Sequence, residues 1–361
     1  MRNGILWMLH RVAPPRIEHL PFGMDSALRL SPEYLEIQII RAKEQGARFV
    51  SIDEFIENKH KKTSRPTDVC ITIDDGTKDI YDHAFPVFKR QNVPFVFYVA
   101  SDFIENGFKN CMKPEADGMQ IMMDIIAKND SLPFEGRTVF AATVPEKQAA
   151  FSVFWQAFIK QKEMMPQKSG YEILQELFTN ELIDFSAYKQ RFLCSWDDLK
   201  DMAQNPLCTI GSHARTHQWL TLIKNDEDLE NEFSQSKRLI ENHIGKTVSH
   251  FSYPYGQYND RVLKFARKYY RSAVSIRAKG KSDRRFTLSS DSDYILPRIS
   301  VQENAFLPAY LGTMSLSRTY TFSEYVRHLF GKVFNFERKG KKRILTLFFI
   351  KIKFKVKKEG A

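Results

Sequence analysis

The chain has 361 residues, of which 43% are hydrophobic and 27% charged; this composition excludes a disordered protein and allows one large α/β domain or two smaller ones. Its net charge of +11 is concentrated near the end, where residues 338–358 hold ten Lys or Arg and no acid, while the rest has 44 basic and 43 acidic residues. A basic nucleic-acid groove through the fold is therefore not expected. The four cysteines have no CxxC or zinc-finger spacing, which indicates reduced, mostly buried thiols.

Strands and helices alternate through the first hundred residues. Strands are expected at 5–9, 49–52, 69–73 and 95–99, where apolar and β-branched or aromatic residues gather. Helices are expected from Ser31-Pro32 to 45, after Ser51, and at 81–90; serine followed by proline or an acid is typical of a helix start. Such an alternation predicts a parallel sheet.

Residues 105–193 interrupt this alternation. They hold helical patterns, such as 119–127 and 146–162, and few strand signals, so we interpret them as a helical insertion. The alternation resumes with a capping box at 195–198, and further elements follow: strands at 208–210, 250–253, 272–275 and 297–301, and helices at 227–243 and 259–269. We therefore expect a domain at 1–305, a helical segment at 306–337 and a basic, apolar tail at 338–361.

Two adjacent acids follow the predicted strand at 69–73. Asp74 and Asp75 come where that strand would end, and Gly76 lets the backbone turn sharply. Side by side, one carboxylate can bind a metal while the other acts as a base. The Asp-Asp-Gly sequence is also common in ordinary turns. Other parts of the chain must therefore distinguish a catalytic site from a simple turn.

Polar and aromatic residues follow two further strands. His213 and His217 are four residues apart, so on a helical turn they would share a face and reach one metal; two surface histidines are the alternative. Tyr255 lies in a Tyr-Pro-Tyr-Gly turn that can direct a backbone N–H at an oxyanion or simply pack. In a parallel α/β barrel these segments would all open at the C-terminal face, where active sites lie.

Three segments in this order, Ile73-Asp-Asp-Gly76, Ser212-His-Ala-Arg-Thr-His217 and Ser252-Tyr-Pro-Tyr255, resemble the polysaccharide deacetylase family, the carbohydrate esterases with a NodB-homology domain. The resemblance runs from about residue 5 to 301, without the insertion. It implies a distorted (β/α)7-type barrel with a helical insertion. It also implies a metal-dependent hydrolase that removes the N-acetyl group from an amino sugar.

The resemblance also implies a role for each motif residue. Asp74 would be the general base that deprotonates the attacking water. Asp75, His213 and His217 would bind a divalent metal, which we expect to be zinc, with iron, cobalt, nickel and manganese as alternatives. The backbone N–H of Tyr255 would help to hold the tetrahedral oxyanion. The products would be a free amine on the sugar and acetate.

Two positions depart from the family pattern. The third motif usually begins with an arginine that orients the base, and here that position is Ser252. We expect Arg298 to substitute from another strand; an ordinary salt-bridging arginine is the alternative. The usual late Leu-x-His segment is also missing, and we expect His10 to act as the general acid, as in family members that look circularly permuted. First and last strands are neighbours in a closed barrel, so a histidine after the first strand can take the place of one near the last strand.

The tail and the N-terminus suggest a setting. Lysine alternates with apolar residues at 351–357, which is expected to give peripheral contact with anionic inner-leaflet lipid at roughly 1 kcal/mol per basic residue. The alternatives are a solvated tail and a nucleic-acid arm; nucleic acid is not an expected partner, because the rest of the chain is near neutral. The apolar run at 5–9 is too short for a signal peptide, so we expect a cytoplasmic location.

This setting favours an N-acetylated sugar on a lipid-linked or nucleotide-linked intermediate of surface-glycan assembly. Two other functions stay open from the sequence. One is a catalytically inactive barrel that binds glycan or scaffolds an assembly complex. The other is an amidohydrolase that acts on an N-formyl sugar or another small amide.

Overall fold

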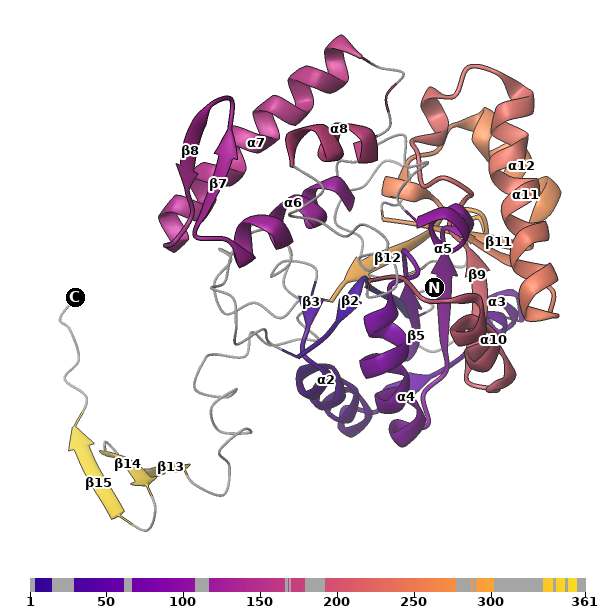
Figure 1. Cartoon of the computed structure of the whole chain (residues 1–361). Coiled ribbons are helices and arrows are strands. Elements are labelled where there is room, and N and C mark those ends of the chain that lie inside the picture. The colour runs from indigo at the N-terminus through magenta and orange to yellow at the C-terminus, as the bar shows by residue number, and fades with distance from the viewer. Residues whose placement is uncertain are drawn as a thin grey trace, which may run out of the picture. The chain divides into compact units, whose positions relative to one another are not determined.

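The computed structural model describes residues 4–14, 29–61, 67–107, 117–165, 168, 170–178, 192–276, 287, 290–301, 334–339, 342–347 and 350–355 (Figure 1). The chain divides into two compact units, Met1–Glu303 and Asn304–Ala361.

Seven parallel strands of the described part of the first unit close into a barrel. Around the ring they are β1 (Ile5–Leu9), β12 (Leu296–Ser300), β11 (Ser272–Ser275), β10 (His250–Ser252), β9 (Cys208–Ser212), β6 (Phe95–Val99) and β5 (Asp68–Ile73). The ring closes because β5 pairs with β1 as well as with β6. The first strand thus lies between β5 and the last barrel strand, β12. The predicted barrel is confirmed.

Three short strands lie beside this ring. β4 (Arg48–Phe49) pairs with the start of β5, and β2 (Arg11–Val12) pairs with β3 (Arg29–Leu30). The predicted strand at 49–52 is therefore wrong in its second half. Ser51 caps the next helix by accepting a hydrogen bond from the Glu54 backbone, so Ile52 already belongs to that helix.

Helices connect the barrel strands (Figure 1). They are α2 (Pro32–Glu44), α3 (Ile52–His60), α4 (Phe85–Gln91) with the π-helical turn η1 (Ile80–Ala84) before it, α5 (Ser101–Asn106), α10 (Trp196–Gln204), α11 (Asp226–Ile244) and α12 (Asp260–Tyr269). The predicted starts are confirmed by their caps: Ser31 accepts from the backbone of Tyr34, and Ser195 forms a reciprocal capping box with Asp198.

The barrel interior is filled by alternate residues of the strands. The buried cluster there includes Leu6, Cys70, Val96, Tyr98, Val274 and Leu296. Tyr98 lies opposite Gly211 in the pairing of β6 and β9, and a Cβ atom on Gly211 would stand only 2.4 Å from the Tyr98 ring. Glycine is required at this position because the tyrosine ring occupies the space of a side chain.

The insertion forms a layer of helices with its own apolar core. It consists of α6 (Asp117–Lys128), β7 (Ser131–Phe134), β8 (Arg137–Phe140), α7 (Val144–Met164) and α8 (Gly170–Leu177). Buried residues such as Phe154, Phe158 and Ile173 pack together between them. The hairpin of β7 and β8 was not predicted; its two turn residues, Glu135 and Gly136, both have positive φ, as a tight hairpin turn requires.

The second unit contains an antiparallel sheet of β13 (Phe334–Lys339), β14 (Lys342–Leu347) and β15 (Ile350–Lys355). The helical segment expected at 306–337 lies almost wholly outside the described residues, and where they resume, at 334–337, the helix prediction is wrong because β13 begins there. None of the helices described in either unit has the length and apolar character needed to cross a bilayer.

Candidate active site

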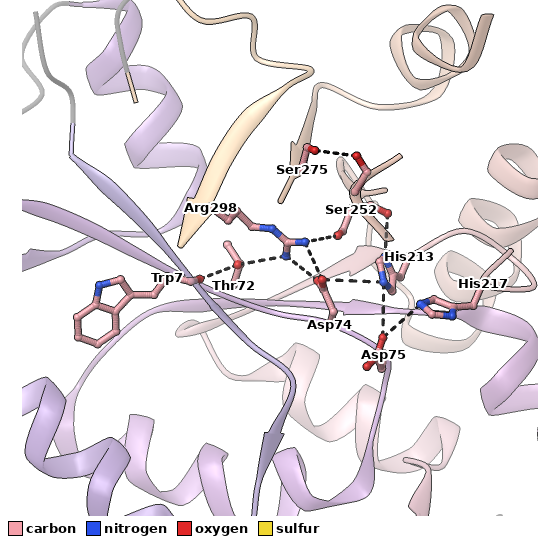
Figure 2. Close-up of polar contacts among 10 residues, drawn as sticks. Trp7, Thr72, Asp74, Asp75, His213, His217, Ser252, Ser275 and Arg298 are labelled. Carbon is pink, nitrogen blue, oxygen red and sulfur yellow. Dashed lines mark hydrogen bonds and ion pairs between the residues drawn. The ribbon is translucent and has the colours of Figure 1, made fainter. Parts of the chain in front are cut away.

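The predicted site residues come together at one end of the barrel. Parallel strands deliver their C-terminal ends to the same face, so residues far apart in the chain meet there. The segments that contribute are His10 after β1, Asp74 and Asp75 after β5, His213 and His217 after β9, Tyr255 after β10, and Arg298 within β12. Figure 2 shows Arg298 on one side of Asp74, and His213 and His217 on the other.

Arg298 forms a two-pronged ion pair with Asp74. Its Nη1 donates to Asp74 Oδ1 at 2.8 Å and its Nη2 donates to Asp74 Oδ2 at 2.7 Å (Figure 2). Both side chains are buried. Burial alone would raise the pKa of the Asp74 carboxyl, but the Arg298 guanidinium beside it holds that pKa well below its usual range. Asp74 is therefore ionised at neutral pH and fixed in orientation.

Ser252 occupies the position where the family motif usually has arginine, and it contacts Arg298, the expected substitute. The Nη2 of Arg298 donates to Ser252 Oγ at 3.0 Å. Arg298 thus reaches side chains of both β5 and β10, neither of which is adjacent to β12, so its guanidinium lies in the barrel interior. The guanidinium thus comes from β12, two strands along the ring from β10, and it contacts Asp74, the predicted base. The absence of arginine at 252 consequently gives no support to an inactive barrel.

Asp75, His213 and His217 form a cluster that could hold a metal ion. The Nε2 atoms of His213 and His217 lie 3.6 Å and 3.4 Å from Asp75 Oδ1, and one potential ligand atom from each residue lies within 4.8 Å of the others. The expected helical turn between the histidines is wrong. Residues 213–217 form a loop, in which Ala214 and His217 have φ of 63° and 54°. The loop, rather than helical periodicity, brings the two rings to one carboxylate.

The protonation of His213 suits a metal ligand. Burial lowers the pKa of His213 to about 4, against the opposing effect of the nearby carboxylates, so the ring is neutral at neutral pH. Its Nδ1 lies 2.8 Å from the Ser252 carbonyl oxygen, which can only accept, so Nδ1 carries the proton. The lone pair of Nε2 then faces Asp75. Two imidazoles and a carboxylate are a donor set that fits zinc and related divalent metals.

Tyr255 lies beside the histidines. It is the central residue of the short turn η4 (Pro254–Gly256), and its φ of 57° is unusual for a residue other than glycine. Its ring centroid is 4.8 Å from that of His217 and 5.7 Å from that of Trp219. The turn therefore forms an aromatic wall next to the cluster of Asp75 and the two histidines.

His10 lies next to Asp74 across the β1–β5 pairing. Leu9 is opposite Ile73 in that register, and the Asp74 backbone N–H donates to the Leu9 carbonyl at 3.1 Å. His10 follows directly and is partly exposed. The His10 carbonyl accepts the Thr77 hydroxyl at 3.4 Å, so His10 also contacts the turn that follows the two adjacent acids. His10 therefore lies beside Asp74 at the ends of two paired strands, and its role as the general acid stays a prediction.

The sequence alone did not point to several residues that hold the site. Thr72 Oγ1 accepts from Arg298 at 3.4 Å and donates to the Trp7 carbonyl at 2.6 Å. Glu232, on α11, binds the loop between the histidines. The sequence did carry a signal for Glu232. This residue falls in the buried stripe of α11, between Leu229 and Phe233, where a carboxylate is unusual unless it has hydrogen-bond partners.

Comparisons with known proteins agree with this geometry. The family model for polysaccharide deacetylase matches residues 61–124 and 161–274. The poly-beta-1,6-N-acetyl-D-glucosamine N-deacetylase of Staphylococcus aureus is 19% identical over 278 residues, which are 77% of this chain and 69% of that protein.

Two solved structures share the fold. IcaB from Ammonifex degensii aligns with a TM-score of 0.52 at 18% identity, over 84% of this chain and 93% of its own. The Streptococcus pyogenes deacetylase PplD, in complex with acetate, aligns with a TM-score of 0.53 at 14% identity, over 83% and 92%. The chain belongs to the polysaccharide deacetylase family and is a hydrolase of carbon–nitrogen bonds other than peptide bonds.

Proposed function

We propose that the protein is a metal-dependent N-deacetylase, which hydrolyses the N-acetyl group of an amino sugar in a surface glycan or a glycolipid intermediate. The observation that carries this proposal is the division of the two adjacent acids. Asp74 is paired with Arg298 and kept ionised, while Asp75 faces two histidines. One acid is thereby available as a base and the other as a ligand.

The residues of the chain would divide the reaction as follows. Asp74 accepts a proton from the attacking water, and Arg298 holds its carboxylate in place. The backbone N–H of Tyr255 donates to the oxyanion that forms when water adds to the amide carbonyl. His10 gives a proton to the leaving nitrogen, the carbon–nitrogen bond breaks, and acetate and a free amine result.

Asp75, His213 and His217 would hold the metal. When bound, a divalent ion supplies Lewis acidity, which polarises the amide carbonyl and lowers the pKa of water. The neutral His213 ring, with its Nδ1–H fixed on the Ser252 carbonyl, presents Nε2 in the form that a metal requires. The identity of the metal is part of the proposal, with zinc as the first candidate.

The test is metal analysis combined with acetate release. We expect purified wild-type protein to contain about one divalent ion per chain, and Asp74→Asn to retain the ion but lose about 10²–10⁴-fold in the rate of acetate release. A wild-type protein that binds no metal, or an Asp74→Asn variant with full activity, would contradict the mechanism.

The substrate is proposed on the relatives and on the expected setting. The Staphylococcus aureus relative is named for poly-beta-1,6-N-acetyl-D-glucosamine, so oligomers of that sugar are the first substrate to assay. A membrane-bound glycolipid with a terminal N-acetylated sugar is the second. Acetate release from chitin-like oligomers alone would argue against both, and an N-formyl sugar in the same assay tests the alternative amide.

The peripheral membrane contact and the cytoplasmic location remain proposals. The ten basic residues within 338–358 support the first. We expect the full chain to sediment with vesicles containing anionic phospholipid and to be released by salt, whereas a chain ending at residue 337 stays in the supernatant. Equal sedimentation of both chains would remove the tail from the argument.

A further inference from the structure

The loop that carries the two proposed histidine ligands has an unfavourable backbone. Ala214 and His217 both have positive φ, a region that residues other than glycine rarely adopt. In an isolated segment these residues would relax to other conformations and the two rings would separate. Something in the fold must hold the loop, because the rings face one carboxylate.

Helix α11 supplies a buried carboxylate that binds this loop. One oxygen of Glu232 accepts the backbone N–H groups of Arg215 and Thr216 at 3.0 and 2.9 Å. The other accepts the Thr216 hydroxyl at 2.7 Å and the Gln218 side-chain amide at 2.9 Å. Glu232 is 4% exposed, so water does not replace these bonds. Its acceptor sites are all used by the segment that separates and follows the histidines.

Ser236, a second residue on the same face of α11, also binds the loop. Ser236, one turn after Glu232, donates its hydroxyl to the Ala214 carbonyl at 3.0 Å, and it also contacts Ser212 Oγ at 2.8 Å. The Asp102 backbone N–H, at the start of α5, donates to the Arg215 carbonyl at 2.9 Å. The peptide groups of the loop are thus held by α11 and α5 together.

We propose that Glu232, with Ser236, is a positioning residue of the metal site: it fixes the loop of residues 213–217, with its left-handed residues Ala214 and His217, before metal binds. This inference rests on the proposed metal-dependent function. Glu232 touches neither the reacting atoms nor the metal; it acts through the peptide groups beside the ligands. A ligand pair that is already in place loses little conformational entropy when metal binds. The hydrogen bonds from Glu232 and Ser236 to the loop, here called the clamp, therefore raise metal affinity.

The chemistry of Glu232 gives two variants with opposite expectations. Glu232→Ala removes every acceptor and leaves the N–H groups of Arg215 and Thr216 unsatisfied. Glu232→Gln keeps one oxygen for those two N–H groups, and its NH2 can donate to the Thr216 hydroxyl oxygen and to a turned Gln218 amide. The conservative variant should therefore rescue the loop, although the charge is lost.

The experiment measures zinc affinity of the purified full chain by competition with a chromophoric chelator, and the unfolding of the metal-free protein. We expect Glu232→Ala to bind zinc about 10–100-fold more weakly than wild type, and Glu232→Gln to stay within a few-fold of wild type. In the metal-free protein, the amides of 215 and 216 should exchange with deuterium faster in Glu232→Ala than in wild type.

Glu241→Ala is the matched control. Glu241 lies on the same helix and accepts the backbone N–H of Val248 at 2.9 Å, away from the histidine loop. We expect it to lower the stability of the metal-free protein without changing zinc affinity. The clamp would be refuted, with the proposed function intact, if Glu232→Ala left zinc affinity unchanged. It would also be refuted if Glu232→Gln or Glu241→Ala lowered zinc affinity as much as Glu232→Ala does. Absence of zinc binding in wild type would overturn the proposed function and the clamp with it.

Discussion

Replacing Arg298 by methionine tests the ion pair on which the proposed base depends. Both nitrogen–oxygen distances to Asp74 are short, at 2.8 and 2.7 Å, and the two side chains are 0% and 3% exposed. Methionine keeps much of the volume but leaves the carboxylate without a cation where water does not reach it. Removal of one partner from a buried pair costs about 3–5 kcal/mol, and we expect Arg298→Met to lower the free energy of unfolding by that amount.

The assay is denaturant unfolding of the metal-free protein at neutral pH. Arg271→Met is the control, because the Arg271–Asp53 pair has a similar distance of 3.2 Å but side chains that are 72% and 52% exposed. An exposed pair contributes about 0–1 kcal/mol, so the control should unfold close to wild type. Adding Asp74→Asn to Arg298→Met should cost less than the sum of the two single changes, since each single change leaves an unpaired partner.

Exchanging the two positions tests whether the guanidinium, rather than its strand, matters. Ser252 Oγ is 3.0 Å from Arg298 Nη2, so an arginine at 252 could reach the same carboxylate if 298 were small. We expect Ser252→Arg/Arg298→Ser to recover most of the stability and acetate release lost in Arg298→Ser. If Arg298→Met costs no more than Arg271→Met, or the exchange recovers nothing, the pairing argument is wrong.

Three further changes test other parts of the site and fold. His217→Ala should lose tight zinc binding in metal analysis after dialysis; retention of a full equivalent would exclude this residue as a ligand. Gly211→Ala should cost about 1–3 kcal/mol by overpacking, and adding Tyr98→Leu should recover part of it; an additive loss in unfolding experiments would disprove the steric cause. Burial raises the pKa of the Cys70 and Cys208 thiols, so both should stay unmodified when the folded protein is alkylated and analysed by mass spectrometry. If either thiol reacts as fast in the folded protein as in the denatured chain, it is not buried.

The barrel and much of the site were predictable because parallel strands gather their ends. Alternation of strand and helix predicted the sheet, and residues placed directly after strands, such as Asp74, His213 and Tyr255, had to meet at one face. Arg298 was predictable as the substitute only because the motif at 252 lacked its arginine. The contact itself depends on the closed ring, which brings β12 within reach of β5.

The conformation of the histidine loop was not predictable from its spacing. A separation of four residues suggests a helical turn, yet the left-handed residues Ala214 and His217 build the arrangement instead. The peptide groups between them are bound by Glu232, which is distant in sequence and is one acid among many on α11. Local patterns describe what a segment prefers alone, whereas this loop follows the partners that tertiary structure supplies.

Arg298 shows how one strand of a barrel can supply a guanidinium at a place where another strand carries a serine. Thr72, Ser252 and Arg298 come from β5, β10 and β12, and all three meet in the interior just beneath Asp74. Side chains of one interior layer approach the same point from different strands, so a guanidinium can be supplied from any of them. The same closure makes the first strand a neighbour of the last, which places His10 at the end of a strand between β5 and β12. The serine at 252 therefore does not by itself indicate that the base lacks a guanidinium partner.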